Sequence, residues 1–295
     1  MTVRIWLLRI AWITLPITAG AAADDFIATF DEAPRVVAAV LLLGSWGAGV
    51  VALLAPRPVG LTFLRAVAPT FAVLAIAALA SEGVDGLSGW GAVAACLVVA
   101  VLTALPDIAR AAANGIAYGD EERFPLRVPP ALFLGLLPLA RGLVVTATVA
   151  GPLLLADGEI ALGIAALVVG APVVYFGSRA LHGLSRRWLV LVPAGVVVVD
   201  PMTLAEPVLF IRRHVRALRA ADPPASIPDG VLDLRLGAAF GNVLIDLDEE
   251  AEMVRTNRGN RGGVATHTAH LMVAVSQRAE FLQSAAGRRV RVQFP

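Results

Sequence analysis

The chain has 295 residues, of which 58% are hydrophobic and 16% are charged, and its formal net charge is +1. Soluble domains carry roughly 25% charged residues, so this composition excludes an entirely soluble protein and indicates a membrane protein. The small net charge excludes the clustered basic excess of a nucleic-acid-binding domain. A single cysteine, Cys96, excludes an intramolecular disulfide and a thiolate metal site.

Six apolar segments fall within the first 180 residues. A helix needs about 20 apolar residues to cross a hydrocarbon layer of roughly 30 Å. Six stretches reach or approach this length: residues 5–23, 36–55, 61–80, 87–105, 131–156 and 160–177. The sequence therefore predicts an α-helical membrane bundle of about six spans over residues 1–180 and a second domain over residues 181–295.

The first segment has two interpretations. Arg4 and Arg9 precede a short apolar run that ends in small residues at 21–23. This order is typical of a first span, and also of a signal peptide with a small-residue cleavage site. Either interpretation puts Asp24 outside the cell and leaves every later span in the same orientation.

Arginine is distributed unevenly between the two sides of the predicted bundle. One side carries Arg4, Arg9, Arg57, Arg65, Arg110, Arg123, Arg127 and Arg179, and the other carries only Arg35. Because cytoplasmic loops hold the excess of basic residues, the Arg-rich side is predicted to be cytoplasmic. We therefore expect a multi-pass inner-membrane protein with cytoplasmic N- and C-termini.

Arg141 is the clearest ionisable residue inside a predicted span. Such residues are functional candidates by default, so Arg141 is a candidate contact for an anionic headgroup or substrate. Pro138 lies just before it and suggests another interpretation, in which the segment breaks and Arg141 extends to the interface. No Asp, Glu or His lies near the middle of any span, and no catalytic motif or cofactor site is recognisable, so we expect no enzyme activity.

Residues 106–130 form the longest connection on the Arg-rich side. Their mixed charge is typical of a solvated loop. The alternative is a docking surface for the C-terminal domain, because both are predicted to be cytoplasmic.

The last 110 or so residues follow a different pattern. Arg186 and Arg187 lie in a basic stretch after the last span and are candidate headgroup contacts. Apolar runs at 188–192 and 196–199 flank a turn with Gly195, which predicts a hairpin. Alternating residues at 232–236 and 243–247 predict further strands, and 277–289 predicts a late helix.

The strand order followed by a late helix is similar to the bacterial pleckstrin-homology-like (PH-like) fold. Residues 187–201 and 203–210, together with 118–121 and the last two spans, resemble a family of uncharacterised actinobacterial multi-pass membrane proteins. The resemblance implies no activity and no catalytic residue. An apparent strand at 290–294 departs from the usual PH-like ending.

Residues 255–263 are the most basic loop of this domain, and Arg258 and Arg261 within it are candidate phosphate or headgroup contacts. A flexible hairpin tip is the simpler interpretation. His267 and His270 follow but lack recognisable partner ligands, so no metal site is expected.

Together these features predict a non-catalytic scaffold or accessory subunit whose cytoplasmic domain binds a protein or a lipid headgroup. The expected partners are membrane lipids and a protein partner or a second copy of the chain, and not nucleic acid. The alternative is a small-molecule or lipid transporter with Arg141 as the anion anchor.

Overall fold

The computed structural model describes residues 3–81, 84–129, 131–221, 230–257 and 260–294. The chain divides into two compact units. The helical unit comprises residues 1–112 and 136–182, and the β-rich unit comprises residues 113–135 and 183–295. The units exchange after residues 112, 135 and 182, so the connection at 113–135 belongs to the β-rich unit together with the residues that follow the last helix.

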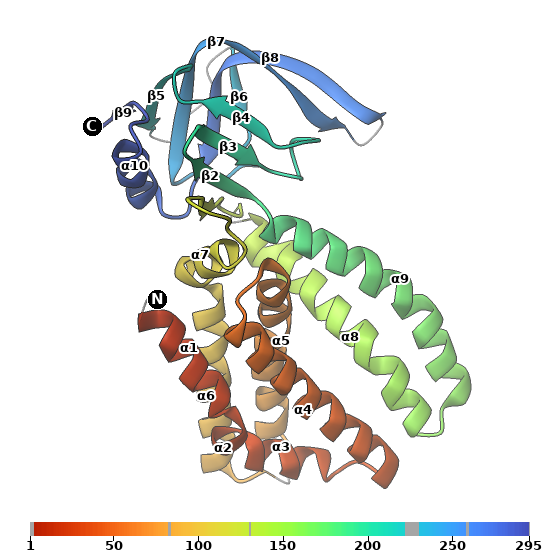
Figure 1. The fold of residues 1–295 in the computed structure, drawn as a ribbon. Helices are drawn as coiled ribbons and strands as arrows, with labels where there is room; N and C mark the ends of the chain where they lie inside the picture. The colour runs from red at the N-terminus through yellow and green to blue at the C-terminus, as the bar shows by residue number, and fades with distance from the viewer. Residues whose placement is uncertain (1–2, 82–83, 130, 222–229, 258–259, 295) are drawn as a thin grey trace. The chain divides into compact units, whose positions relative to one another are not determined.

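Five helices among the described residues are long and apolar enough to cross a membrane. They are α4 (Glu32–Leu54), α5 (Pro58–Leu79), α6 (Gly86–Ala104), α8 (Leu137–Ala156) extended at its start by the π-helical stretch η1 (Leu132–Leu136), and α9 (Ile160–Ser185) (Figure 1). They confirm five of the six predicted spans. Pro138 does not end the segment: the helix continues through it, and the turn before it is the π-helical stretch η1.

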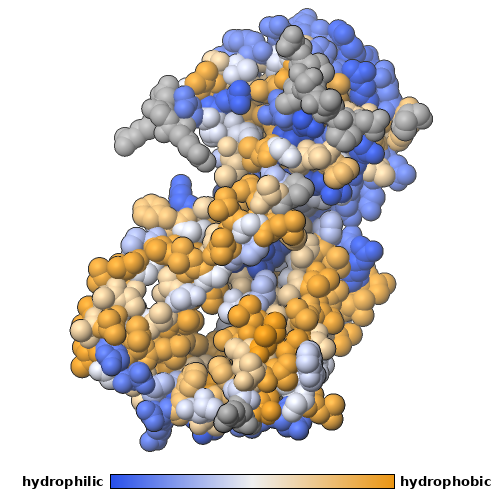
Figure 2. Space-filling view, turned by 180° about the vertical axis from the view of Figure 1, so that it is seen from behind, coloured by the Kyte–Doolittle hydropathy of each residue, from blue (hydrophilic) through white to orange (hydrophobic). Residues whose placement is uncertain are grey.

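The outward faces of these helices are apolar. Exposed large hydrophobic side chains include Leu43 on α4, Leu143 on α8 and Val168 on α9. Figure 2 shows hydrophobic residues over much of the surface of the helical unit. Water-soluble monomers rarely expose apolar patches beyond a few hundred Å², so this surface is that of a membrane protein.

The first predicted span is three short helices: α1 (Val3–Ile13), α2 (Leu15–Thr18) and α3 (Gly20–Ile27). Pro16 explains the break, because it has no N–H to donate to the carbonyl of Trp12. The Trp46 indole Nε1 donates to that carbonyl instead, at 2.9 Å, and the Trp12 Nε1 donates to the Trp46 carbonyl, also at 2.9 Å. This reciprocal pair fastens the broken segment to α4.

Two arginines satisfy the carbonyl groups at the ends of neighbouring helices. Arg9 donates to the Leu53 carbonyl at the end of α4, through Nε at 3.1 Å and Nη2 at 2.8 Å. Arg65 of α5 donates Nε to the Thr103 carbonyl at 3.1 Å, at the end of α6. The last carbonyls of a helix lack intrahelical partners and carry the negative end of its dipole, so a guanidinium there stabilises both.

The β-rich unit contains two sheets. The first has the order β1-β2-β3-β4 and the second β6-β8-β7-β5-β9. Their strands are β1 (Glu122–Pro125), β2 (Trp188–Val192), β3 (Gly195–Val199), β4 (Val208–Ile211), β5 (Val215–Ala220), β6 (Val231–Asp233), β7 (Asn242–Asn257), β8 (Asn260–Ala274) and β9 (Val292–Gln293). The predicted β2–β3 hairpin and the late helix, α10 (Arg278–Gly287), are confirmed.

Strand β1 comes from the connection between α7 (Pro106–Asn114) and α8, far from the other strands in sequence. It pairs antiparallel with β2, with Phe124 opposite Leu189. Phe124 is fully buried and meets Phe281 of α10 edge to face, with ring centroids 5.3 Å apart. The strand therefore supplies both a sheet edge and part of the core.

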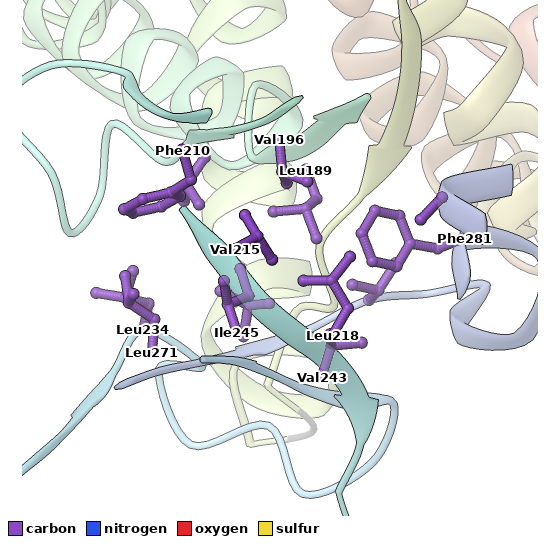
Figure 3. Close-up of a cluster of buried hydrophobic side chains, with 14 of the residues drawn as sticks. Leu189, Val196, Phe210, Val215, Leu218, Leu234, Val243, Ile245, Leu271 and Phe281 are labelled. Carbon is purple, nitrogen blue, oxygen red and sulfur yellow. The ribbon is translucent and has the colours of Figure 1, made fainter. Parts of the chain in front are cut away.

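One hydrophobic core lies between the two sheets and α10. Figure 3 shows Leu189, Val196 and Phe210 of the first sheet pointing toward Val215 and Ile245 of the second. The labelled core residues are Leu189, Val196, Phe210, Val215, Leu218, Leu234, Val243, Ile245, Leu271 and Phe281. This shared core makes the β-rich unit one folding unit.

The contact between α1 and α4 provides a stability test. A Cβ at Gly49 would lie 2.0 Å from the Trp12 ring, whereas a Cβ at Gly44 of the same helix meets nothing within 4 Å. We expect Gly49→Ala to destabilise the full-length protein by about 1–3 kcal/mol through overpacking. Gly44→Ala, the matched control, should leave stability unchanged or slightly raised. Thermal unfolding in detergent measures both, and equal effects would contradict the packing described.

Candidate functional site

Arg187, a predicted headgroup contact, is buried inside the β-rich unit. Its guanidinium donates Nε and Nη2 to the two carboxylate oxygens of Asp200, both at 2.8 Å. Nη1 donates to the Arg127 carbonyl and Nη2 to the Leu234 carbonyl, each at 3.1 Å. The two side chains are 1% and 0% exposed. The prediction for Arg187 is therefore wrong, because its donors are directed at protein groups and not at the surface.

This network explains why a charge is tolerated at such depth. A buried ion pair is stable only when good geometry and further hydrogen bonds offset the desolvation of both charges. The bidentate arrangement with Asp200 supplies the geometry. The two carbonyl contacts join the segment after β1, the start of β2 and the segment after β6, so Arg187 ties together three parts of the unit.

The other predicted contacts of the β-rich unit are Arg186, Arg258 and Arg261. Arg186 is exposed directly after the helical end of α9. Arg258 lies outside the described residues. The backbone of Arg261 belongs to β8, whereas its side chain lies outside what the structure describes. Contacts of these three residues with a headgroup or phosphate stay predictions.

Arg141 lies in α8, which packs against α4 and α5, and its side chain is half-buried. Arg65 lies on α5, one of the two helices that α8 contacts. Among the described residues, neither guanidinium forms an ion pair with a carboxylate. Arg65 and Arg141 thus lie on neighbouring helices of the helical unit, and the sequence pattern singled out only Arg141 as a candidate contact.

Two further polar side chains lie near Arg65 in the fold. Thr62 precedes Arg65 by three residues on α5, so the two share a helix face. The Thr62 hydroxyl lies 3.4 Å from Nδ1 of His182, near the end of α9. The Thr62 hydroxyl also donates to the Pro58 carbonyl at 2.9 Å, so this polar group joins α5 to α9.

A second polar group crosses the second sheet of the β-rich unit. Asp246 of β7 is buried, and its carboxylate contacts Nδ1 of His270 on β8 and Nη2 of Arg219 on β5, both at 2.8 Å. The register places Asp246 directly opposite His270. The carboxylate orients the imidazole and neutralises the arginine, so the group joins three strands. No group of three metal-ligating residues occurs in the described part of the chain.

The edge strand β1 is held by a third polar group. The Asn114 side chain accepts from the Arg123 N–H at 2.9 Å and donates to the Arg123 carbonyl at 2.8 Å. The Arg123 guanidinium lies 5.0 Å from the Trp188 ring centroid and donates to Glu121 at 2.8 Å. This hydrogen bond to Arg123 lowers the pKa of Glu121 below its ordinary value.

No protein family, no curated protein and no solved structure matches this chain. The geometry of the clusters described above is therefore the basis for any functional assignment.

The buried pair of Arg187 and Asp200 leads to a stability prediction. We expect Asp200→Ala to destabilise the β-rich unit by about 3–5 kcal/mol, because it leaves a buried guanidinium unpaired. Asp248→Ala is the control, since Asp248 and its partner Arg216 are 41% and 59% exposed, and such pairs contribute about 0–1 kcal/mol. Pulse proteolysis of the full-length protein in urea measures both. Similar losses in the two variants would contradict a structural role for the buried pair.

The lowered pKa of Glu121 leads to a pH prediction. A carboxyl whose pKa is depressed on folding stabilises the fold above its unfolded pKa, and this stabilisation is lost as pH falls through the folded value. Glu121→Gln should therefore be less stable than the native chain near neutral pH, and the difference should shrink as pH falls below the ordinary pKa of 4.5 toward the lower pKa of the folded state. Pulse proteolysis between pH 7 and 3.5 measures this difference. A gap that widens toward low pH would rule out the interaction.

Proposed function

We propose that the chain is a multi-pass protein of a bacterial inner membrane, acting as a non-catalytic scaffold or accessory subunit. Its β-rich unit lies in the cytoplasm and binds a protein partner or a lipid headgroup. The observation that carries the proposal is the connection of this unit to the helices. The chain passes between the two units at three points, after residue 112, after residue 135 and after residue 182. A domain tethered in this way stays at the membrane surface.

The strand order supports a PH-like character for the β-rich unit. The meander β2-β3-β4 is followed by β5, the β7–β8 hairpin and α10, which packs on the shared core. Three features are additions to such a fold: β1 from between the spans, and the parallel pairings of β6 and β9. Membership of the actinobacterial family that the sequence resembles is part of the same proposal.

The contacts of the broken first segment support a sixth crossing. At one end, Arg4 of α1 forms an ion pair with Asp107, which follows α6. At the other end, Asp24 of α3 lies 3.4 Å from Arg35 at the start of α4. Residues 3–27 thus run from the end of α6 to the start of α4 (Figure 1). With α4, α5, α6, α8 and α9, the proposed topology therefore has six crossings and cytoplasmic termini.

Cysteine labelling tests this topology. In a Cys96→Ala background, Asp31→Cys and Glu159→Cys should react with a membrane-impermeant maleimide added to intact spheroplasts. Val3→Cys and Asp120→Cys should react only after the membrane is permeabilised. Reaction of Asp31→Cys and Val3→Cys from the same side would contradict a crossing by the first segment, and a mature chain lacking residues 1–23 by intact mass would establish a cleaved signal.

The distal part of the β7–β8 hairpin is the surface for testing partner binding. Its pairing is interrupted between Asp246 and Ala251, and beyond this point the hairpin contacts residues 203–205. Glu252 and Val264 on this part are exposed. It offers both a charged and an apolar side chain at the surface.

Photo-crosslinking in native membranes tests the proposed scaffold. A photoreactive residue at Glu252 or Val264 should give a discrete crosslinked product with a second protein or with lipid, identified by mass spectrometry. The same residue at Gln293, exposed on β9, is the matched control and should give little product. Recovery of self-crosslinks alone, or equal yields at all three positions, would count against the proposal.

Arg141 favours a second candidate, a small-molecule or lipid transporter anchored at this residue, because it is half-buried in α8 and forms no ion pair with a carboxylate among the described residues. A lipid transporter would move fluorescent phospholipid between the leaflets of proteoliposomes, which dithionite quenching detects. A scaffold would leave the protected fraction near one half, as in vesicles without protein.

A further inference from the structure

The first sheet has two edge strands, β1 and β4, and the protein itself closes the edge at β1. The Asn114 side chain bonds both the N–H and the carbonyl of Arg123. The carbonyl of Pro125 accepts from the Ser276 N–H at 2.9 Å. A strand edge whose outward groups are satisfied in this way is closed to a further strand. The edge at β4 therefore decides whether this sheet can be extended.

At β4, backbone hydrogen-bonding groups point away from the sheet. The Arg212 N–H donates to the Ala194 carbonyl at 2.9 Å, on the side of β3. Because alternate residues of a strand direct their N–H and C=O groups to the same side, Phe210 also faces β3, whereas Leu209 and Ile211 face outward. Within the described part of the chain, the Leu209 N–H and carbonyl and the Ile211 N–H have no hydrogen-bond partner.

The side chains along this edge are apolar and exposed. Leu209 is 47% exposed and Ile211 is 39% exposed. Phe210 lies between them and is buried in the core that the two sheets share. The four residues of β4 contain no charge, no proline and no bulge. Natural proteins protect free edges with such features, so this edge indicates a strand that pairs with another chain.

Opposite charges flank the two ends of β4. Glu206 lies before the strand, Arg212 and Arg213 lie after it, and all three are exposed. None of the three forms an ion pair with another described residue. A strand with an acid at its start and bases at its end complements an antiparallel copy of itself, because each acid then lies near the bases of the other copy. This order of charges favours a second copy of the chain over an unrelated strand.

We propose that β4 pairs antiparallel with β4 of a second copy of the chain, about a two-fold axis at Phe210. Leu209 of each copy then exchanges two hydrogen bonds with Ile211 of the other, which satisfies all the open groups described above. The Ile211 carbonyl already accepts from the His214 N–H at 2.8 Å, and its second lone pair is available for this bond. A register shifted toward the start of the strand would meet Pro207, which has no N–H to donate.

The pairing joins two four-stranded sheets into one continuous sheet. Two short strands bury little area, whereas a stable interface between freely diffusing proteins needs at least about 1,000 Å². Copies held in one membrane meet at a raised effective concentration. We therefore expect a dimer that persists in lipid and dissociates on dilution in detergent, an expectation that rests on the membrane anchoring proposed above. The surface differs from the β7–β8 hairpin and goes beyond the partner binding proposed there.

Disulfide trapping in native membranes tests the register. In a Cys96→Ala background, Leu209→Cys combined with Ile211→Cys places thiols in hydrogen-bonded pairs, whose Cα atoms lie about 5.5 Å apart and within disulfide range. Oxidation with copper phenanthroline should convert this variant to a covalent dimer. Leu209→Cys alone is the matched control. It offsets the two thiols by two residues, beyond disulfide range, and should give several-fold less dimer.

Energy transfer in proteoliposomes measures the dimer without a crosslink. Donor and acceptor dyes are attached to separate copies at Gln293→Cys in the Cys96→Ala background. Leu209→Lys should weaken association about 10-fold, because a lysine protects a strand edge from pairing. Val264→Lys is the matched control, since Val264 is 46% exposed on the other sheet. It should change association by less than about twofold, and an equal loss in the two variants would overturn the proposal.

A charge exchange tests the second copy as the occupant, even if Leu209→Lys does not fold. Glu206→Arg should weaken association about 2- to 5-fold, as should Arg212→Glu with Arg213→Glu. All three changes in one chain should restore it, and failure of this rescue would overturn the two-fold pairing.

A disulfide from Leu209→Cys to another protein, in place of the dimer, would assign the edge to a different partner and overturn the proposal. Crosslinking at the β7–β8 hairpin is read at other positions, so its result is independent of the dimer.

Discussion

Backbone carbonyls that lose their helix or strand partners must find other donors, and this constraint accounts for much of the structure. Pro16 leaves the carbonyl of Trp12 without a helical N–H donor, and the Trp46 indole donates to it instead. Arg9 and Arg65 do the same for the ends of α4 and α6. In hydrocarbon such groups cannot turn to water, and each one left unmet costs several kcal/mol. Side-chain donors with fixed planar geometry therefore satisfy these carbonyls and link each helix to a neighbour.

The same chemistry operates in the β-rich unit, where Arg187 donates to two carbonyls and to Asp200. The function of an arginine in this chain therefore depends on what its donors meet. The guanidinium of Arg187 donates only to protein groups and is structural. Arg65 uses two of its nitrogens, Nε and Nη2, for backbone carbonyls. Arg141, with no hydrogen bond among the described residues, is the one of these three best able to bind a ligand.

Local patterns in the sequence were enough to predict five spans, the β2–β3 hairpin and the late helix, because hydropathy and turn residues act over short distances. They did not predict β1, since its four residues lie in a polar stretch and gain their strand partner only from Trp188 onward. Nor did they predict the burial of Arg187, which depends on Asp200 thirteen residues away. The positive-inside rule counts Arg9 and Arg65 only as charges. Their hydrogen bonds with the ends of α4 and α6 join residues far apart in the sequence and could be seen only in the three-dimensional structure.

The position of β1 in the chain has a consequence for biogenesis. During synthesis, β1 emerges before α8 and α9, whereas β2, the strand with which it pairs, follows them. The first sheet therefore cannot close until the α8–α9 hairpin has been made, and in a membrane-inserted chain that means after its insertion. The β-rich unit can therefore be complete only after the last two helices have been made. A chain stalled or misinserted at this hairpin would present Phe124 and an unpaired strand edge to chaperones and proteases.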